Sequence, residues 1–84
     1  LERDFHAAHP DFTLQSRQEK LLPAAPAREL IGQTAERALQ VYLLTSSQRA
    51  FVLEFSAPPA DFDRMRPLFE EMAESFTILK RGKP

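Results

Sequence analysis

The 84-residue chain contains no cysteine and no tryptophan, and its only glycines are Gly32 and Gly82. The lack of cysteine excludes disulfides, thiolate metal ligands and cysteine nucleophiles. Two isolated glycines do not form the glycine-rich loop that holds a phosphate group. A chain without cysteine is compatible with any compartment, so the sequence does not indicate a localisation.

The chain also lacks a marked excess of charge and a long apolar run. Eleven basic and twelve acidic residues give a net charge of −1, so nothing in the charge points to nucleic acid or anionic lipid as a partner. No apolar run approaches the roughly 18 residues of a spanning helix, and direct membrane insertion is not expected. Hydrophobic residues make up 43% and charged residues 27%, which is typical of one small globular domain.

Most of the seven prolines separate the stretches in which regular structure is expected. Apolar spacing predicts a short helix over 1–8, and alternation predicts a half-buried strand over 12–19. The segment 27–34 is expected to be a second strand, although Pro26 would also suit the first turn of a helix. The segments 38–45 and 50–56 are rich in strand-forming residues, and with the polar loop 46–49 between them they predict a hairpin. The apolar segment 76–79 predicts a short final strand.

Alternation within the hairpin divides each strand into two rows. The rows Leu39, Val41, Leu43 and Phe51, Leu53, Phe55 are the more apolar, and they are expected to form one core face together. The opposite rows are mixed in character, and they are the candidate contact surface for a protein partner: Gln40, Tyr42, Leu44, Val52 and Glu54.

A helix is predicted from Pro59 or Ala60 to Glu74. Its apolar residues fall on a single stripe at helical spacing, which is expected to be core: Phe62, Met65, Leu68, Phe69, Met72 and Phe76. Pro67 removes a backbone donor inside this segment, so the helix is expected to kink or to split after its first turn.

Together these elements predict an α+β domain over residues 1–79. Its antiparallel sheet has about four to five strands, with a long C-terminal amphipathic helix on one face and a short N-terminal helix. Residues 80–84 form a basic tail. One long helix covers only one face of such a sheet, so self-association or docking on a parent domain is expected.

The polar residues do not form a recognisable catalytic or metal-binding pattern. His6 and His9 have helical spacing, and Asp4 or Asp11 could add a carboxylate ligand, but surface histidines are the simpler interpretation. Three helical glutamates and three serines fit solvated positions better than acid–base or nucleophilic roles, namely Glu70, Glu71, Glu74, Ser46, Ser47 and Ser75. We therefore expect no enzyme activity, no cofactor and no metal.

Several short motifs, in this order, resemble the Mog1/PsbP/DcrB-like superfamily. They are Pro26-Ala-Arg-Glu-Leu, then Arg49-Ala-Phe-Val-Leu-Glu-Phe-Ser-Ala-Pro-Pro, then Phe62 and Phe69-Glu-Glu-Met-Ala-Glu-Ser-Phe76. The upstream His-Pro-Asp-Phe-Thr-Leu is similar to the DcrB-like branch. The resemblance covers residues 1–79, and it implies N-terminal strands that this chain lacks. Either the chain is a fragment of a larger domain, or its sheet is completed from elsewhere.

The resemblance implies a shared scaffold rather than a shared site. The leading hypothesis is a non-catalytic protein-interaction or assembly module, such as a chaperone, an adaptor or an envelope-associated accessory domain. The alternative is a non-catalytic accessory or regulatory domain of a larger enzyme. A small-molecule carrier would need a cavity between Phe69 and Phe51, and core-like phenylalanines argue against it. The expected partner is a protein or a second copy, giving a homo-oligomer or a domain docked on its parent.

Overall fold

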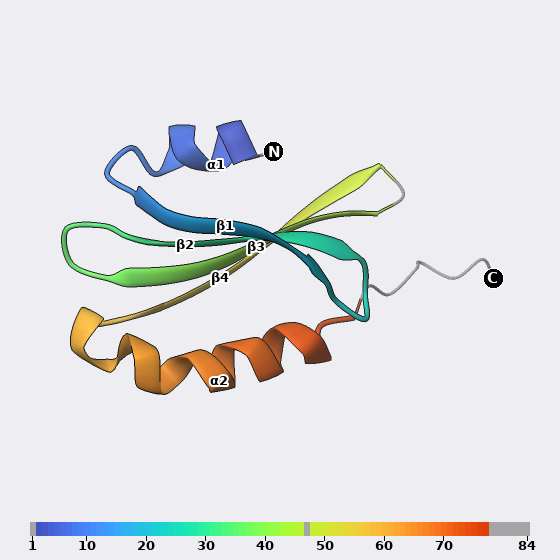
Figure 1. Cartoon of the computed structure of the whole chain (residues 1–84). Coiled ribbons are helices and arrows are strands. Elements are labelled where there is room, and N and C mark those ends of the chain that lie inside the picture. Colours follow the sequence, from blue (N-terminus) through green and yellow to red (C-terminus); the bar gives the residue numbers. More distant parts are fainter. Residues whose placement is uncertain (1, 47, 78–84) are drawn as a thin grey trace.

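The computed structural model describes residues 2–46 and 48–77, which form an α+β domain (Figure 1). Four strands make one antiparallel sheet in the order β1-β2-β3-β4. One helix precedes the sheet and one follows it, so the predicted fold class is confirmed. The elements are α1 (Glu2–Ala8), β1 (Thr13–Leu21), β2 (Pro26–Gln33), β3 (Ala38–Ser46), β4 (Arg49–Ala57) and α2 (Pro59–Ser75).

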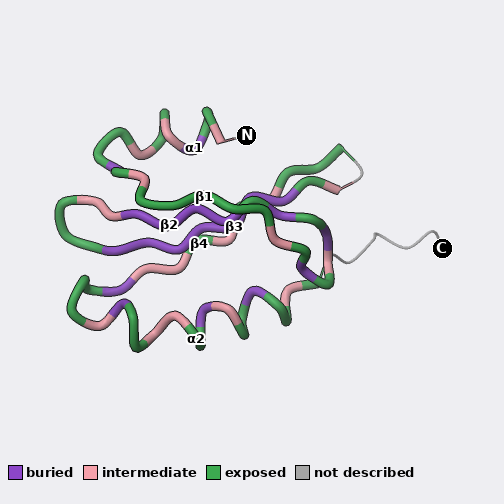
Figure 2. The backbone as a smooth tube through the Cα atoms, viewed as in Figure 1, coloured by how far each residue is buried: buried purple, intermediate pink, exposed green. Residues whose placement is uncertain are grey.

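The two helices lie on opposite faces of the sheet (Figure 1). On the side of α1, here the α1 face, Phe5 packs with Phe12, Leu30 and Val41. The other side, here the α2 face, carries a larger core that is shared by residues of β2, of both hairpin strands and of the long helix, among them Tyr42, Leu44, Ile31, Phe62, Phe69 and Ala73. Burial on both faces makes the central strands β2 and β3 the most enclosed part of the chain (Figure 2).

Strand β3 is buried along nearly its whole length. Leu39, Val41 and Leu43 face α1, whereas Tyr42 and Leu44 belong to the core beneath α2. All five are at most 5% exposed. A near-continuous apolar run is typical of a strand that is covered on both faces, and the stretch Ala38–Leu44 fits that description with one polar interruption.

The register of the hairpin contradicts the predicted core face. Val41 pairs with Glu54, and Tyr42 pairs with Leu53. Directly opposite residues share a face of an antiparallel sheet, so the row containing Leu53 lies with Tyr42 and not with Val41. The prediction that the two most apolar rows meet is therefore wrong. Because each face is covered by a helix, each face receives one of these rows.

Helix α2 is continuous from Pro59 to Ser75, although it contains Pro67. Of the two outcomes predicted for Pro67, a kink or a split of the helix, the split is wrong. Pro67 and Asp63, whose carbonyl loses its usual partner, are both exposed, so water is available to that carbonyl. The predicted apolar stripe is also broader than the buried contact, because Leu68 is 46% exposed and Met72 is 47% exposed.

Gly32 in β2 is required by the close packing around Phe12. A Cβ atom at this position would lie 2.6 Å from Phe12 Cζ and closer still to the carbonyl oxygen of Thr13. Real Cβ contacts do not approach this closely, so any larger residue would displace the Phe12 ring from the core or move β1. The glycine thus lets an aromatic ring approach the backbone of the sheet closely beneath α1.

Smaller differences from the sequence predictions occur at the ends of elements. The segment after Pro26 is a strand, as expected, and Ser46 already pairs with Arg49, so the hairpin loop is shorter than predicted. Phe76 and Thr77 are not in a strand, and the rest of the predicted final strand and the tail lie outside the described residues. Within the described part of the chain, neither helix has the length and apolar character required to cross a membrane.

Candidate functional site

The five predicted contact residues do not share a surface. Gln40, Tyr42 and Leu44 point from β3 toward α2 and are at most 1% exposed. Val52 and Glu54 point from β4 to the α1 face, where Val52 is 46% exposed. The expectation of one common contact face is therefore wrong, because the register of β3 and β4 places the two groups on opposite faces of the sheet. Only Val52 and Glu54 are available to a partner while α2 stays in place.

The buried part of the predicted set belongs to a polar cluster beneath α2. Gln40 Nε2 donates to Glu29 Oε2 at 2.9 Å and to the Tyr42 hydroxyl at 2.8 Å, and Gln18 Nε2 donates to Glu29 Oε1 at 2.7 Å. Glu29 and Gln40 are at most 1% exposed. Gln40 Oε1 is buried and has no hydrogen-bond partner in the described part of the chain. The cluster links β1, β2 and β3 through side chains.

Burial and hydrogen bonding set the pKa of both ionisable groups in this cluster. Burial raises the pKa of the Glu29 carboxyl, but hydrogen bonds from Gln18, Gln40 and Tyr42 outweigh it, so the net pKa is lowered. The pKa of Tyr42 is raised by burial, then by the Glu29 carboxylate and by Glu70 of α2. At neutral pH Glu29 is ionised and Tyr42 is protonated. The cluster holds a fixed charge and offers no group that titrates near pH 7.

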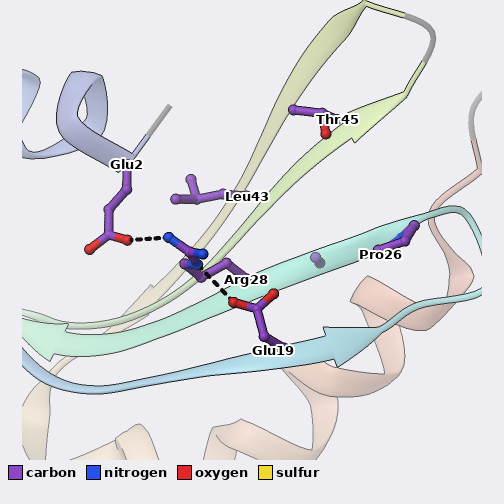
Figure 3. Close-up of a pocket in the computed structure, with 7 residues that line it drawn as sticks. Glu2, Glu19, Pro26, Arg28, Leu43 and Thr45 are labelled. Carbon is purple, nitrogen blue, oxygen red and sulfur yellow. Dashed lines mark hydrogen bonds and ion pairs between the residues drawn. The ribbon is translucent and has the colours of Figure 1, made fainter.

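A second cluster, on the α1 face, ties α1 to the sheet. Glu2 of α1 accepts hydrogen bonds from Arg17 of β1 and from Arg28 of β2, the latter at 3.2 Å. Arg28 also donates to Glu19 at 2.9 Å, so its guanidinium lies between two carboxylates (Figure 3). These groups border a cavity of about 290 Å³, which is lined by Glu2, Glu19, Pro26, Ala27, Arg28, Leu43 and Thr45. Each of the two arginine guanidiniums is paired with at least one carboxylate, so the cluster links α1 to the sheet by electrostatic attraction.

The Glu2 carboxyl is strongly affected by this link. A hydrogen bond from Arg17 lowers its pKa from 4.5 to about 2, with burial opposing the change and His6 and Arg28 adding to it. A lowered pKa in the folded state contributes stability above the ordinary pKa, and that contribution disappears as pH falls toward the folded value. Glu2 is 13% exposed but both arginines are nearly half exposed, so solvent screening keeps the expected contribution modest.

Replacing Glu2 by glutamine should lower the free energy of unfolding by about 1 kcal/mol at pH 7. The difference from the unchanged chain should shrink as pH falls from 4.5 toward 2. Urea unfolding of both proteins at several pH values measures it. Asp4→Asn, an exposed change in the same helix, is the control and should have little effect. A Glu2→Gln difference that is the same at pH 7 and pH 2.5 would contradict the role of the charge.

The other polar candidates lie in unrelated places. His6 contacts Glu2 at 3.1 Å, whereas His9 stacks on the Phe5 ring at 4.5 Å and approaches Glu54 at 3.4 Å. Among residues 2–46 and 48–77, no three histidine or carboxylate side chains gather as a metal site would require. Glu71, Glu74 and Ser75 are exposed on α2. These positions do not bring a nucleophile and a base together.

The two edges of the sheet differ in how they are protected. The edge strand β1 carries Arg17, Glu19 and Lys20, and its register with β2 shifts between Leu14 and Ser16. Charged residues and a bulge are the usual means by which proteins prevent pairing at an edge. Figure 2 shows β1 as the most exposed strand. This edge is therefore poorly suited to binding another strand.

The edge strand β4 has neither form of protection. Its pairing with β3 runs over nine residues without a shift, and Glu54 is the one charged residue between its ends. No described strand pairs with its outer side. Phe51, Leu53 and Phe55 remain only partly buried on the α2 face, and Val52 is exposed on the other. This open apolar edge, here the β4 edge, is the most evident binding feature of the described chain.

Sequence reasoning missed two features of the site. Glu2, Arg17 and Arg28 lie far apart in the sequence, and only the fold brings them together. The open side of β4 was not identified as the contact surface, although its charge-poor sequence beside the charged β1 was a usable signal. Comparison of the chain with protein-family models, with curated proteins and with solved structures finds no match.

Proposed function

We propose that the chain is a non-catalytic protein-interaction or assembly module that binds an extended segment along the β4 edge. The observation that supports this is the contrast between a charged, bulged edge at β1 and an unprotected edge at β4. Backbone hydrogen bonds along an added strand supply affinity, and alternate side chains supply selectivity. A Mog1/PsbP/DcrB-like scaffold, as in the DcrB-like branch, would serve here as an adaptor or accessory domain.

This mode of binding differs from packing a partner helix onto the sheet. The face that contains Tyr42 and Leu44 already carries α2, so a helix from another protein would have to displace it. An added strand at β4 leaves both helices where they are. It also uses the partly exposed sides of Phe51 and Leu53, which α2 does not fully cover.

A simple strand-forming probe tests the proposal. A capped nine-residue peptide of alternating valine and threonine is titrated into the isotopically labelled chain, and backbone amide signals are followed by NMR. The expected result is a change in the backbone amide signals along β4. Strand β1 is the internal control and should not respond, because its edge is charged.

A matched peptide separates strand addition from non-specific apolar binding. The same peptide with every backbone amide methylated keeps its side chains but cannot donate hydrogen bonds, and it should leave the β4 signals unchanged. Equal responses at β1 and β4, or equal responses to the two peptides, would contradict binding by strand addition.

A further inference from the structure

The side chains of β4 are placed symmetrically about the middle of the strand, so two copies of β4 can pair antiparallel with apolar residues opposite one another. Strand β4 has nine residues, with Leu53 in the middle. A twofold axis at Leu53 pairs two copies of β4 in antiparallel fashion over their whole length and sets Phe51 of one copy opposite Phe55 of the other. Opposite residues share a face, and both phenylalanines lie on the α2 face. The pairing therefore joins the α2 faces of two copies.

The same twofold axis would pass beside the C-terminal part of helix α2. Phe55 stacks on Phe69 with ring centroids 5.3 Å apart, and Phe51 meets Phe76 at 5.7 Å. Leu53 lies between these two contacts, so the level of α2 beside it lies between residues 69 and 76. Met72 is in the middle of that interval and is 47% exposed. A twofold axis at Leu53 therefore passes close to an exposed apolar residue of the helix.

The exposed apolar flank of α2 faces the open side of the sheet. Arg66 pairs with Glu70 at 3.8 Å and its Nε is buried, and the Glu70 carboxylate raises the pKa of Tyr42 in β3. The flank that carries Arg66 and Glu70 is therefore turned toward the middle of the sheet. Leu68 and Met72 are each two residues from Glu70, which is a rotation of about 200° around the helix. They consequently lie on the opposite flank, above the β4 edge, and this explains their exposure.

Spacing also favours a second copy as the occupant. Helix α2 contacts β3 and β4, so its axis runs above the gap between them. In a paired sheet the two helix axes would then be separated by two strand spacings, about 10 Å. Packed helices are about 8–10 Å apart. A lone strand would leave the flank with Leu68 and Met72 exposed, whereas a second copy covers it.

The charges at the two ends of the pairing are complementary. Arg49 at the start of β4 would lie opposite Ala57 of the second copy, next to the start of that copy's α2. Asp61 is in the first turn of α2 and precedes Leu68 by seven residues, so both lie on the same flank. Arg49 makes no ion pair with any of the described residues, and Asp61, which is 44% exposed, pairs with Arg64 of its own helix at 2.9 Å. Each copy thus brings a cation to the other's acidic helix start.

We propose that the chain forms a symmetric dimer in which β4 pairs antiparallel with β4 of a second copy, with the twofold axis beside Leu53 and Met72. The dimer would be an eight-stranded sheet with two α2 helices side by side on one face and two α1 helices on the other. It rests on the proposed use of the β4 edge for binding, and it names a second copy as the partner.

In the proposed pairing Val52 lies opposite Glu54 of the second copy, so a positive charge at position 52 should strengthen the dimer and a negative charge should weaken it. Val52→Lys should strengthen the dimer roughly fivefold, because two new lysine–glutamate pairs form across the strands. Val52→Glu should weaken it by a similar factor. Sedimentation equilibrium over a range of concentrations measures both. Leu21→Glu changes an exposed apolar residue on the opposite edge and should leave the association unchanged. A tighter dimer of Val52→Lys that keeps the cooperative unfolding transition of the unchanged chain could not result from misfolding.

The absence of native cysteine allows a direct test of the axis. Met72→Cys should give a disulfide-linked dimer on mild oxidation, whereas Leu21→Cys should not. The proposed β4–β4 pairing would be overturned if the chain remained monomeric at millimolar concentration. It would also be overturned if the chain dimerised with an affinity that did not depend on the charge at position 52. If the valine–threonine peptide still binds β4 in that case, the proposed function stands without a second copy. If neither peptide nor copy binds, both proposals fail.

Discussion

Replacing Phe69 by alanine should lower the free energy of unfolding by about 4 kcal/mol. Phe69 is 5% exposed, stacks on Phe55 and packs beside Phe62, so its removal leaves a cavity between α2 and the sheet. A chain of this length is expected to have a total stability of about 4–13 kcal/mol. The variant should therefore lose much of its cooperative unfolding transition, as measured by circular dichroism in urea.

The neighbouring residue provides a matched control for this change. Leu68→Ala alters the same helix by one position but removes a half-exposed side chain, so about 1 kcal/mol or less is expected at concentrations where the chain is monomeric. If the two variants were equally destabilised, α2 would not be held by the buried ring. Similar small losses in both would place the main core elsewhere, on the α1 face.

The second large effect is expected in the polar cluster beneath α2. Replacing Gln40 by leucine removes the donor to both Glu29 and Tyr42 and leaves a buried carboxylate with fewer partners. We expect a loss of about 2–4 kcal/mol in the free energy of unfolding. The pKa of Glu29 should rise in this variant, because a hydrogen bond that lowers it is gone. Urea unfolding and carboxyl NMR titration measure the two quantities.

Removing the whole cluster should cost less than breaking it. The triple variant Glu29→Leu, Gln40→Leu and Tyr42→Phe has no buried charge or unpaired hydroxyl, so its loss should be smaller than that of Gln40→Leu alone. Because the pKa of Glu29 is lowered, its contribution is present above the ordinary carboxyl pKa and is lost as pH falls through the folded value. Strictly additive losses, or a triple variant as unstable as Gln40→Leu, would contradict this account.

The sequence predicted the elements better than their arrangement. Periodicity located all four strands and both helices, because alternation and helical spacing are local properties of the chain. Alternation divides β3 and β4 into rows but does not state which rows meet. Which rows share a face depends on the register of the two strands. Placing the two most apolar rows on one face was wrong, because both faces of the sheet are covered and each needs an apolar row.

The candidate site was less predictable than the fold. Gln40 and Tyr42 were assigned to a contact surface because their row is mixed, yet mixed rows also occur where a polar group is buried with its partners. Leu68 and Met72 were assigned to the core because they share a stripe with Phe69. A stripe says which side of a helix is apolar, and it does not say how much of that side a narrow sheet can cover. The ion pairs of Glu2 depend wholly on tertiary structure.

The order of the strands also has a kinetic consequence. Every strand of the sheet is the neighbour in space of its neighbour in sequence, so no long loop has to close before a pair of strands can form. Folding rates rise as the sequence separation of contacting residues falls. We expect the chain to fold faster than sandwiches and barrels of similar size, with the hairpin of β3 and β4 forming early. Mutations in that hairpin should slow folding, whereas changes in α1 should mainly speed unfolding.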